Sequence, residues 1–196
     1  MKTLFLMIVG CLIISTNPVY AQLTKTSKKA VSATAKQFAK EGWVLDGTGT
    51  FSTVLTSHYS KLDSGEVSEL VGNASRKNSI NMAKTVARNN AINEYAESAR
   101  SMIRAKMTTD VKDVNDEQRE NFAAEYERLV IKEMNGTLKT SFYIYKSNDD
   151  GTYNVRAFFL VDEKAMASVN DNAIQEAANE VGIAKENAQK VTELIK

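Results

Sequence analysis

The sequence predicts an α+β fold in which helices pack on a small, mainly antiparallel sheet. Two observations carry this prediction. Residues 137–162 hold two β-rich runs on either side of a turn cluster, residues 147–151, which is the pattern of a β-hairpin. Most other periodic segments have apolar residues at helical spacing, and such amphipathic helices need a sheet on which to bury their apolar face.

The first 21 residues are typical of a signal peptide. A short basic start precedes a nearly continuous apolar run, residues 4–14, and the segment ends in Val-Tyr-Ala before Gln22. We expect cleavage after Ala21, export to the periplasm or out of the cell, and one mature domain, residues 22–196. The apolar run is shorter than the roughly 20 residues that a spanning helix needs, and no later stretch is apolar enough. We therefore expect no transmembrane span in the mature chain.

Cys11 offers a second interpretation of this leader. Residues 8–11, Ile-Val-Gly-Cys, look like a lipobox, which would place a lipid on Cys11 and tether the protein to a membrane. The apolar run continues past the cysteine and the segment before it is very short, so soluble export is favoured. Because Cys11 is the only cysteine, a chain cleaved after Ala21 would have no disulfide and no cysteine metal ligand.

Helical and extended segments alternate at the start of the mature chain. Residues 22–40 are expected to form a loose N-terminal helix, and residues 43–45, Trp-Val-Leu, a short strand closed by a turn at residues 46–49. In residues 51–62, apolar side chains recur at i, i+3, i+4, i+7 and i+8, which predicts a helix despite the β-branched residues there. Residues 66–76 are expected to form another strand.

Two long helices and the hairpin follow. Residues 79–107 carry a stripe of alanines that lets a helix approach a sheet closely, while its charged residues, Lys84 among them, are expected to face water. Residues 116–134 start at an acidic, capped end and stop at Asn135-Gly136. In the hairpin, alternation places one set of residues on the first face and an apolar set on the second. The first set is Leu138, Thr140, Phe142 and Ile144, and the second is Tyr143, Tyr145, Phe158 and Leu160.

The C-terminal region is expected to be helical, with an interruption near Asn170 and a long helix over residues 170–196. Its apolar residues from Ile174 to Ile195 are spaced by three and four, which is a heptad seam. The seam predicts either self-association through residues 174–195 or packing on the protein's own domain. Alanine at three of seven seam positions buries little area, which favours packing within the domain.

No group of residues in the sequence indicates catalysis or a cofactor. His58 is the only histidine, and its place on the apolar face of a helix favours packing over general-base chemistry. Zinc would have too few ligands, residues 148–151 lack the acidic positions of a calcium loop, and residues 47–49 lack the rest of a phosphate loop. The full chain carries a net charge of only +1, which gives no basic excess for nucleic acid. We expect no cofactor, no metal and no enzyme activity.

Several of these features resemble one known group of proteins. They are Gly42-Trp43, the alanines of the long helix from Ala83 to Ala99, and the hairpin over residues 143–161. The chain resembles the bacterial LPP-type lipoprotein family, which is related to the N-terminal domain of flagellar assembly protein T, and its uncharacterised exported relatives. The likeness covers about residues 42–162. It implies an α/β domain with helices on a small antiparallel sheet, a cell-envelope location and no established catalytic residues.

Three hypotheses for function follow. The leading one is a non-enzymatic cell-envelope protein that binds another envelope protein or supports surface structure. The second is a periplasmic module that binds a small ligand in a pocket near Trp43, His58 and Tyr59, and the third is a hydrolase that works through carboxylates alone. The residues expected to form the partner or ligand surface are Trp43, His58, Tyr59, Tyr143, Tyr145, Phe158 and Leu160.

Overall fold

The computed structural model describes residues 24–111 and 113–195, so the predicted signal peptide and Cys11 lie outside the described residues. Helices and strands follow one another in an order that places the hairpin between two pairs of helices. They are α1 (Lys25–Lys40), β1 (Val44–Asp46), α2 (Phe51–Leu62), β2 (Val67–Lys77), α3 (Ile80–Asp110), α4 (Asp116–Thr137), β3 (Lys139–Ser147), β4 (Tyr153–Asp162), α5 (Glu163–Val181) and α6 (Lys185–Ile195).

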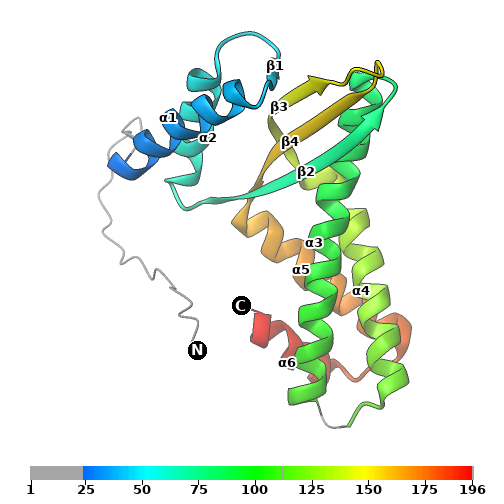
Figure 1. Cartoon of the computed structure of the whole chain (residues 1–196). Coiled ribbons are helices and arrows are strands. Elements are labelled where there is room, and N and C mark those ends of the chain that lie inside the picture. Colours follow the sequence, from blue (N-terminus) through cyan, green and yellow to red (C-terminus); the bar gives the residue numbers. More distant parts are fainter. Residues whose placement is uncertain (1–23, 112, 196) are drawn as a thin grey trace, which may run out of the picture.

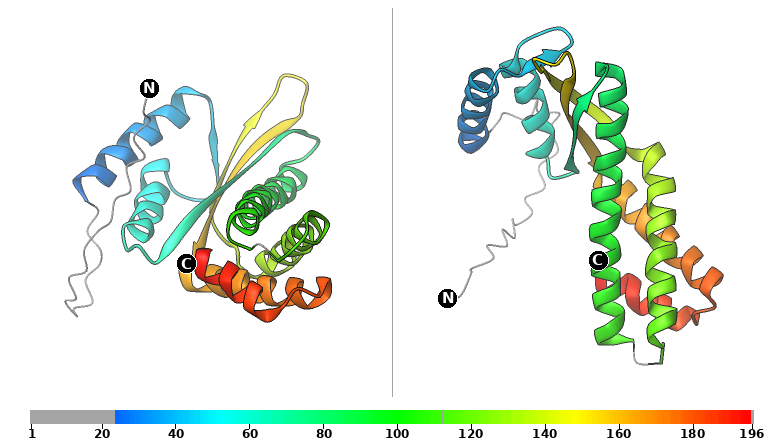
Figure 2. Two further views of the ribbon diagram at one scale, coloured as in Figure 1. Left: turned by 90° about the horizontal axis from the view of Figure 1, so that it is seen from below. Right: turned by 45° about the vertical axis from the view of Figure 1, so that its right-hand side comes forward.

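The four strands form one antiparallel sheet in the order β1-β3-β4-β2 (Figure 1). α1 and α2 lie on one face of this sheet, and α3 lies on the other face beside α4 (Figure 2). α3 continues well past the sheet and packs there with α4 and α6, and α4 packs with α5. The α+β fold predicted from the sequence is confirmed. Among the described helices, none is long and apolar enough to cross a membrane.

The sheet separates two hydrophobic cores. The larger core joins the α3-facing side of the sheet to α3, α4, α5 and α6. The smaller core joins the opposite side to α1 and α2, and it contains Val31, Phe38, Leu55, Phe142 and Phe158. Phe142 and Phe158 stack at its centre, with ring centroids 4.3 Å apart. Each face of the sheet therefore buries apolar side chains under helices.

The alanine stripe of α3 lets this helix lie unusually close to β2. Ala83, Ala87 and Ala91 are buried against the sheet, as their spacing predicts. Opposite them is Gly72, and a Cβ atom added at Gly72 would lie 1.8 Å from the carbonyl oxygen of Ala87. Only a residue without a side chain fits at this point of β2.

A β-bulge at Ser141 corrects the predicted faces of the hairpin. The register of β3 and β4 shifts between Thr140 and Phe142, so Ser141 is an extra residue in β3. The predicted faces assume that side chains alternate strictly along β3. The extra residue moves the side chains after the bulge to the opposite face from the one predicted. Leu138 consequently lies in the larger core and Phe142 in the smaller one.

The apolar second face predicted for the hairpin is also wrong. Phe142 lies opposite Phe158, and Tyr143 lies opposite Ala157. Residues directly opposite each other in paired strands share a face. Tyr143 and Tyr145 therefore lie on the α3 side of the sheet, whereas Phe158 lies on the α1 and α2 side.

The C-terminal region is helical, as predicted, but it consists of two helices rather than one long helix over residues 170–196. The break falls at Gly182, which has a left-handed φ of 72°, and not near Asn170. Most of the seam side chains are buried in the larger core of the same chain, and so they are not available to a second chain. The buried ones are Ile174, Ala177, Ala188 and Val191.

Asn170 lies inside α5, and hydrogen bonds of its side chain link α5 to α3 and α4. Its Oδ1 accepts hydrogen bonds from the Tyr126 hydroxyl of α4 at 2.8 Å and from the Tyr95 hydroxyl of α3 at 3.2 Å. Tyr126 is fully buried, and burial raises its pKa well above the ordinary value for tyrosine. Burial also raises the pKa of Tyr95.

Because burial raises the pKa of both tyrosines, we expect the protein to lose stability at alkaline pH. In the unfolded chain a tyrosine ionises near pH 10, while Tyr126 in the fold keeps its proton, so stability present below about pH 10 falls as the pH rises further. Each such tyrosine lowers the free energy of unfolding by up to about 1.4 kcal/mol per pH unit. Urea unfolding at about pH 9 and pH 11 should show this decline, and Tyr126→Phe should make it smaller. An unchanged decline in Tyr126→Phe would show that Tyr126 does not cause it.

Candidate functional site

The structure removes three residues from the predicted surface. His58 is 1 % exposed, Phe158 8 % and Leu160 5 %, so all three are buried. Trp43, Tyr59, Tyr143 and Tyr145 remain partly exposed, but they do not lie on one surface. Trp43 and Tyr59 pack against the smaller core, and the other two pack against the larger one. The predicted ligand pocket near Trp43, His58 and Tyr59 requires His58 to reach a surface, but the structure buries this residue.

His58 is held between a serine and a carboxylate. Its Nδ1 lies 2.9 Å from Ser141 Oγ, and its Nε2 lies 2.6 Å from Glu69 Oε1. The bulge in β3 places Ser141 on this side of the sheet, next to Phe142. The imidazole ring also packs edge-on against Phe142, with centroids 5.4 Å apart.

This serine, histidine and carboxylate set resembles a catalytic triad only in its residue types. In a triad the serine needs access to a substrate, and the carboxylate orients the ring from within the protein. Here the carboxylate is the more exposed partner of the histidine, with 36 % of the Glu69 side chain accessible, and the ring itself is enclosed by aromatic side chains. The arrangement satisfies both nitrogens of a buried imidazole, which is what packing requires.

Trp43 is fixed at the edge of the same face. The Arg156 guanidinium lies over its ring, 5.2 Å from the centroid, and its Nε1–H donates to Glu41 at 3.0 Å. Hydrogen bonds from Gln37, and then from Trp43, hold the pKa of the Glu41 carboxyl below its usual range. Trp43 therefore closes the smaller core at this edge and is already in contact with protein groups.

A more open site lies on the opposite face, between the start of α3 and strands β1, β3 and β4. α3 packs over β2 and β4, and no described helix packs over this side of β1 and β3. We call this surface the tyrosine groove. It consists of Val44, Asp46, Ile80, Asn81, Lys84, Tyr143, Tyr145 and Tyr153.

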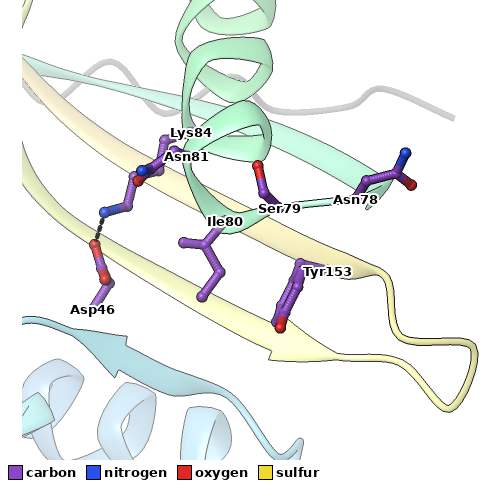
Figure 3. Close-up of a pocket in the computed structure, with 7 residues that line it drawn as sticks. All are labelled: Asp46, Asn78, Ser79, Ile80, Asn81, Lys84 and Tyr153. Carbon is purple, nitrogen blue, oxygen red and sulfur yellow. Dashed lines mark ion pairs between the residues drawn. The ribbon is translucent and has the colours of Figure 1, made fainter.

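One end of the tyrosine groove is closed by an ion pair between Lys84 of α3 and Asp46 of β1 (Figure 3). The Lys84 ammonium group also lies 5.2 Å from the centre of the Tyr143 ring, on its face. This contact corrects the expectation that Lys84 faces water, because its side chain is only 25 % exposed. The pair fixes β1 against α3.

The other end of the groove is aromatic and open. Ile80 extends from the first turn of α3 toward the strands, beside Tyr153 (Figure 3). The Tyr145 and Tyr153 rings meet edge to face, with centroids 6.4 Å apart. Val44, opposite Tyr145 in the sheet, is 48 % exposed. An open hollow of about 380 Å³ lies between the ion pair and Tyr153.

The lining of the groove combines apolar and polar side chains. Tyrosine rings and aliphatic side chains offer apolar area, and the tyrosine hydroxyls, Asn81 and the ion pair offer hydrogen-bonding groups. In the described part of the chain, no cluster of three or more His, Cys, Asp or Glu side chains could hold a metal ion.

The sequence predicts Tyr143 and Tyr145 as surface residues, but no pattern in it indicates their partners. Asp46 has the pattern of a turn residue and Lys84 that of a solvated one, and they meet because the pairing of β1 with β3 brings Asp46 within reach of the start of α3. Comparisons with protein-family models, with curated proteins and with solved structures found no match, so the resemblance to LPP-type lipoproteins stays a prediction.

Proposed function

We propose that the protein is a non-enzymatic module of the cell envelope that binds an extended segment of a partner protein in the tyrosine groove. The observation that carries the proposal is the set of three partly exposed tyrosines beside the part of the α3-facing side of the sheet, at β1 and β3, over which no described helix packs. Aromatic residues are enriched at protein interfaces because they provide a large, rigid contact area with a polar tip. The leader sequence of residues 1–21 supports the envelope location.

An extended segment fits this site better than a small ligand does. Ligand pockets usually enclose most of their ligand, whereas this hollow is open to solvent. β1 is an edge strand of only three residues, and no other described strand pairs with its outer backbone edge. A partner segment that pairs with this edge places alternate side chains beside Val44, which adjoins Tyr145 in the sheet.

Photocrosslinking in the native cell tests the proposal. A photoreactive residue at Asn81, which lines the hollow, should give an adduct of one discrete mass. The matched control is the adjacent Met82, which is 52 % exposed and points about 100° away around α3. The adduct should be lost when Tyr145 and Tyr153 are replaced by alanine. Equal adducts at both positions, or none at Asn81, would contradict the proposal.

The envelope location has a separate test. Amino-terminal sequencing of the protein released by osmotic shock should start at Gln22. A chain that starts at Cys11 and carries a fatty acid, which Cys11→Ser removes, would replace soluble export by lipid anchoring. A chain that starts at Met1 in the cytoplasmic fraction would refute export.

A further inference from the structure

α1 carries all of its charges on one side, and all are positive. The helix contains Lys25, Lys28, Lys29, Lys36 and Lys40 and no carboxylate. At 3.6 residues per turn these five side chains fall within an arc of about 120°. All five are exposed. We call them the lysine face.

The opposite side of α1 holds the helix on the protein. Val31 and Phe38 are 5 % and 3 % exposed and belong to the smaller core, with Ala35 beside them. The Phe38 ring contacts Phe51 of α2 and Phe158 of β4. α1 is the outermost element on this face of the sheet (Figures 1 and 2). Because its apolar side is buried in the smaller core, its lysine face points into solvent.

The charge of the lysine face is not neutralised within the described structure. None of its five ammonium groups has an ion-pair partner among the described residues. The nearby carboxylates are engaged elsewhere: Glu41 accepts from Gln37 and Trp43, Asp46 pairs with Lys84, and Asp63 accepts from the Ser27 hydroxyl. A positive field therefore extends from α1 into solvent.

Charge is also divided between the two sides of the molecule. Residues 24–62 contain six lysines and two carboxylates, whereas residues 63–196 contain 18 basic and 22 acidic residues. The chain is nearly neutral as a whole, but it has a basic layer at α1 and α2 and an acidic remainder. Such a charge distribution orients a protein on a negatively charged surface.

We propose that the lysine face docks on the surface of an anionic phospholipid membrane. Its composition favours lipid over nucleic acid: no arginine occurs before Arg76, and the exposed side of α1 has no aromatic residue for stacking on bases. Lysines act on a lipid surface as separate point charges, each raising the affinity about fivefold. The interaction is independent of the proposed partner, because the tyrosine groove lies on the other side of the sheet and stays accessible.

Vesicle sedimentation of the protein as isolated from the expressing cell tests this docking. Binding to phosphatidylcholine vesicles with about 30 % phosphatidylglycerol should be strong at low salt and fall as salt screens the charges, and vesicles of phosphatidylcholine alone should not bind. Glutamine at all five positions of the lysine face should lower the binding constant at least about 100-fold. An unchanged melting temperature would show that this variant is folded.

The matched control changes the net charge equally at another place. It replaces five exposed lysines by glutamine, namely Lys132, Lys139, Lys164, Lys185 and Lys190, and should keep most of the binding. An equal loss in the control would attribute binding to net charge and overturn the proposal. Binding to neutral vesicles, no binding to anionic ones, or displacement from them by equimolar duplex DNA would overturn it too. None of these results depends on the partner in the tyrosine groove.

Discussion

Gly72→Ala is expected to destabilise the protein by about 3 kcal/mol or more. The added Cβ would lie 1.8 Å from the carbonyl oxygen of Ala87, and neither atom can turn away, because the backbone of β2 fixes the Cβ and the oxygen belongs to the backbone of α3. α3 would have to move off β2, which would open the packing of Ala83 and Ala91 as well. The midpoint of urea unfolding, measured with its slope, reports this loss.

A second glycine provides the control. Gly136 lies in the last turn of α4, and a Cβ added there meets nothing within 4 Å. Gly136→Ala should raise stability by about 0.5 to 1 kcal/mol, because alanine loses less backbone entropy in a helix. Equal effects of the two substitutions would show that the close approach of α3 and β2 is not the cause.

His58→Ala is expected to cost about 3 kcal/mol of stability. It removes a buried ring from contact with Phe142, Phe158 and Tyr59, and it leaves Ser141 Oγ without its 2.9 Å partner. His58→Phe restores most of the ring packing but neither hydrogen bond, so its cost should be smaller, about 1 to 2 kcal/mol. Thermal and urea unfolding of the two variants separate packing from hydrogen bonding.

His58→Phe also serves to test the proposal that the protein is not an enzyme. A fluorophosphonate probe, which phosphonylates activated serines with loss of fluoride, should leave Ser141 unmodified in the native protein, because the His58 ring is enclosed. Labelling of Ser141 that disappears in His58→Phe would instead show an activated nucleophile and would contradict the non-enzymatic proposal.

Local patterns in the sequence were sufficient for most elements of the fold. The spacing of apolar residues from Phe51 to Leu62 predicts α2, and the turn at residues 147–151 predicts the hairpin. The end of α4 is harder to predict from the sequence. Asn135-Gly136 looks like a stop, but Gly136 does not adopt a left-handed conformation, and α4 continues to Thr137. Arg88 of α3 donates to the Asn135 and Leu138 carbonyls and so stabilises this last turn from outside.

The candidate sites depend on contacts that no local pattern contains. The bulge at Ser141 moves the residues that follow it to the other face, and nothing in the residues around it marks the extra position. The ion pair of Asp46 with Lys84 requires β1 to pair with β3, which brings Asp46 within reach of the start of α3. The lysine face, in contrast, was present in the sequence, but its outward orientation became evident only from the packing of Phe38.

The smaller core has a consequence for the time course of folding. His58 and Ser141 are separated by 83 positions in the chain, and Phe38 meets Phe158 across a still longer separation. During synthesis from the N-terminus, α1 and α2 therefore lack the sheet on which they pack until the hairpin has been synthesised. During that interval their apolar sides are open to chaperones or to aggregation. Folding of the N-terminal layer is completed by residues that arrive near the end of synthesis.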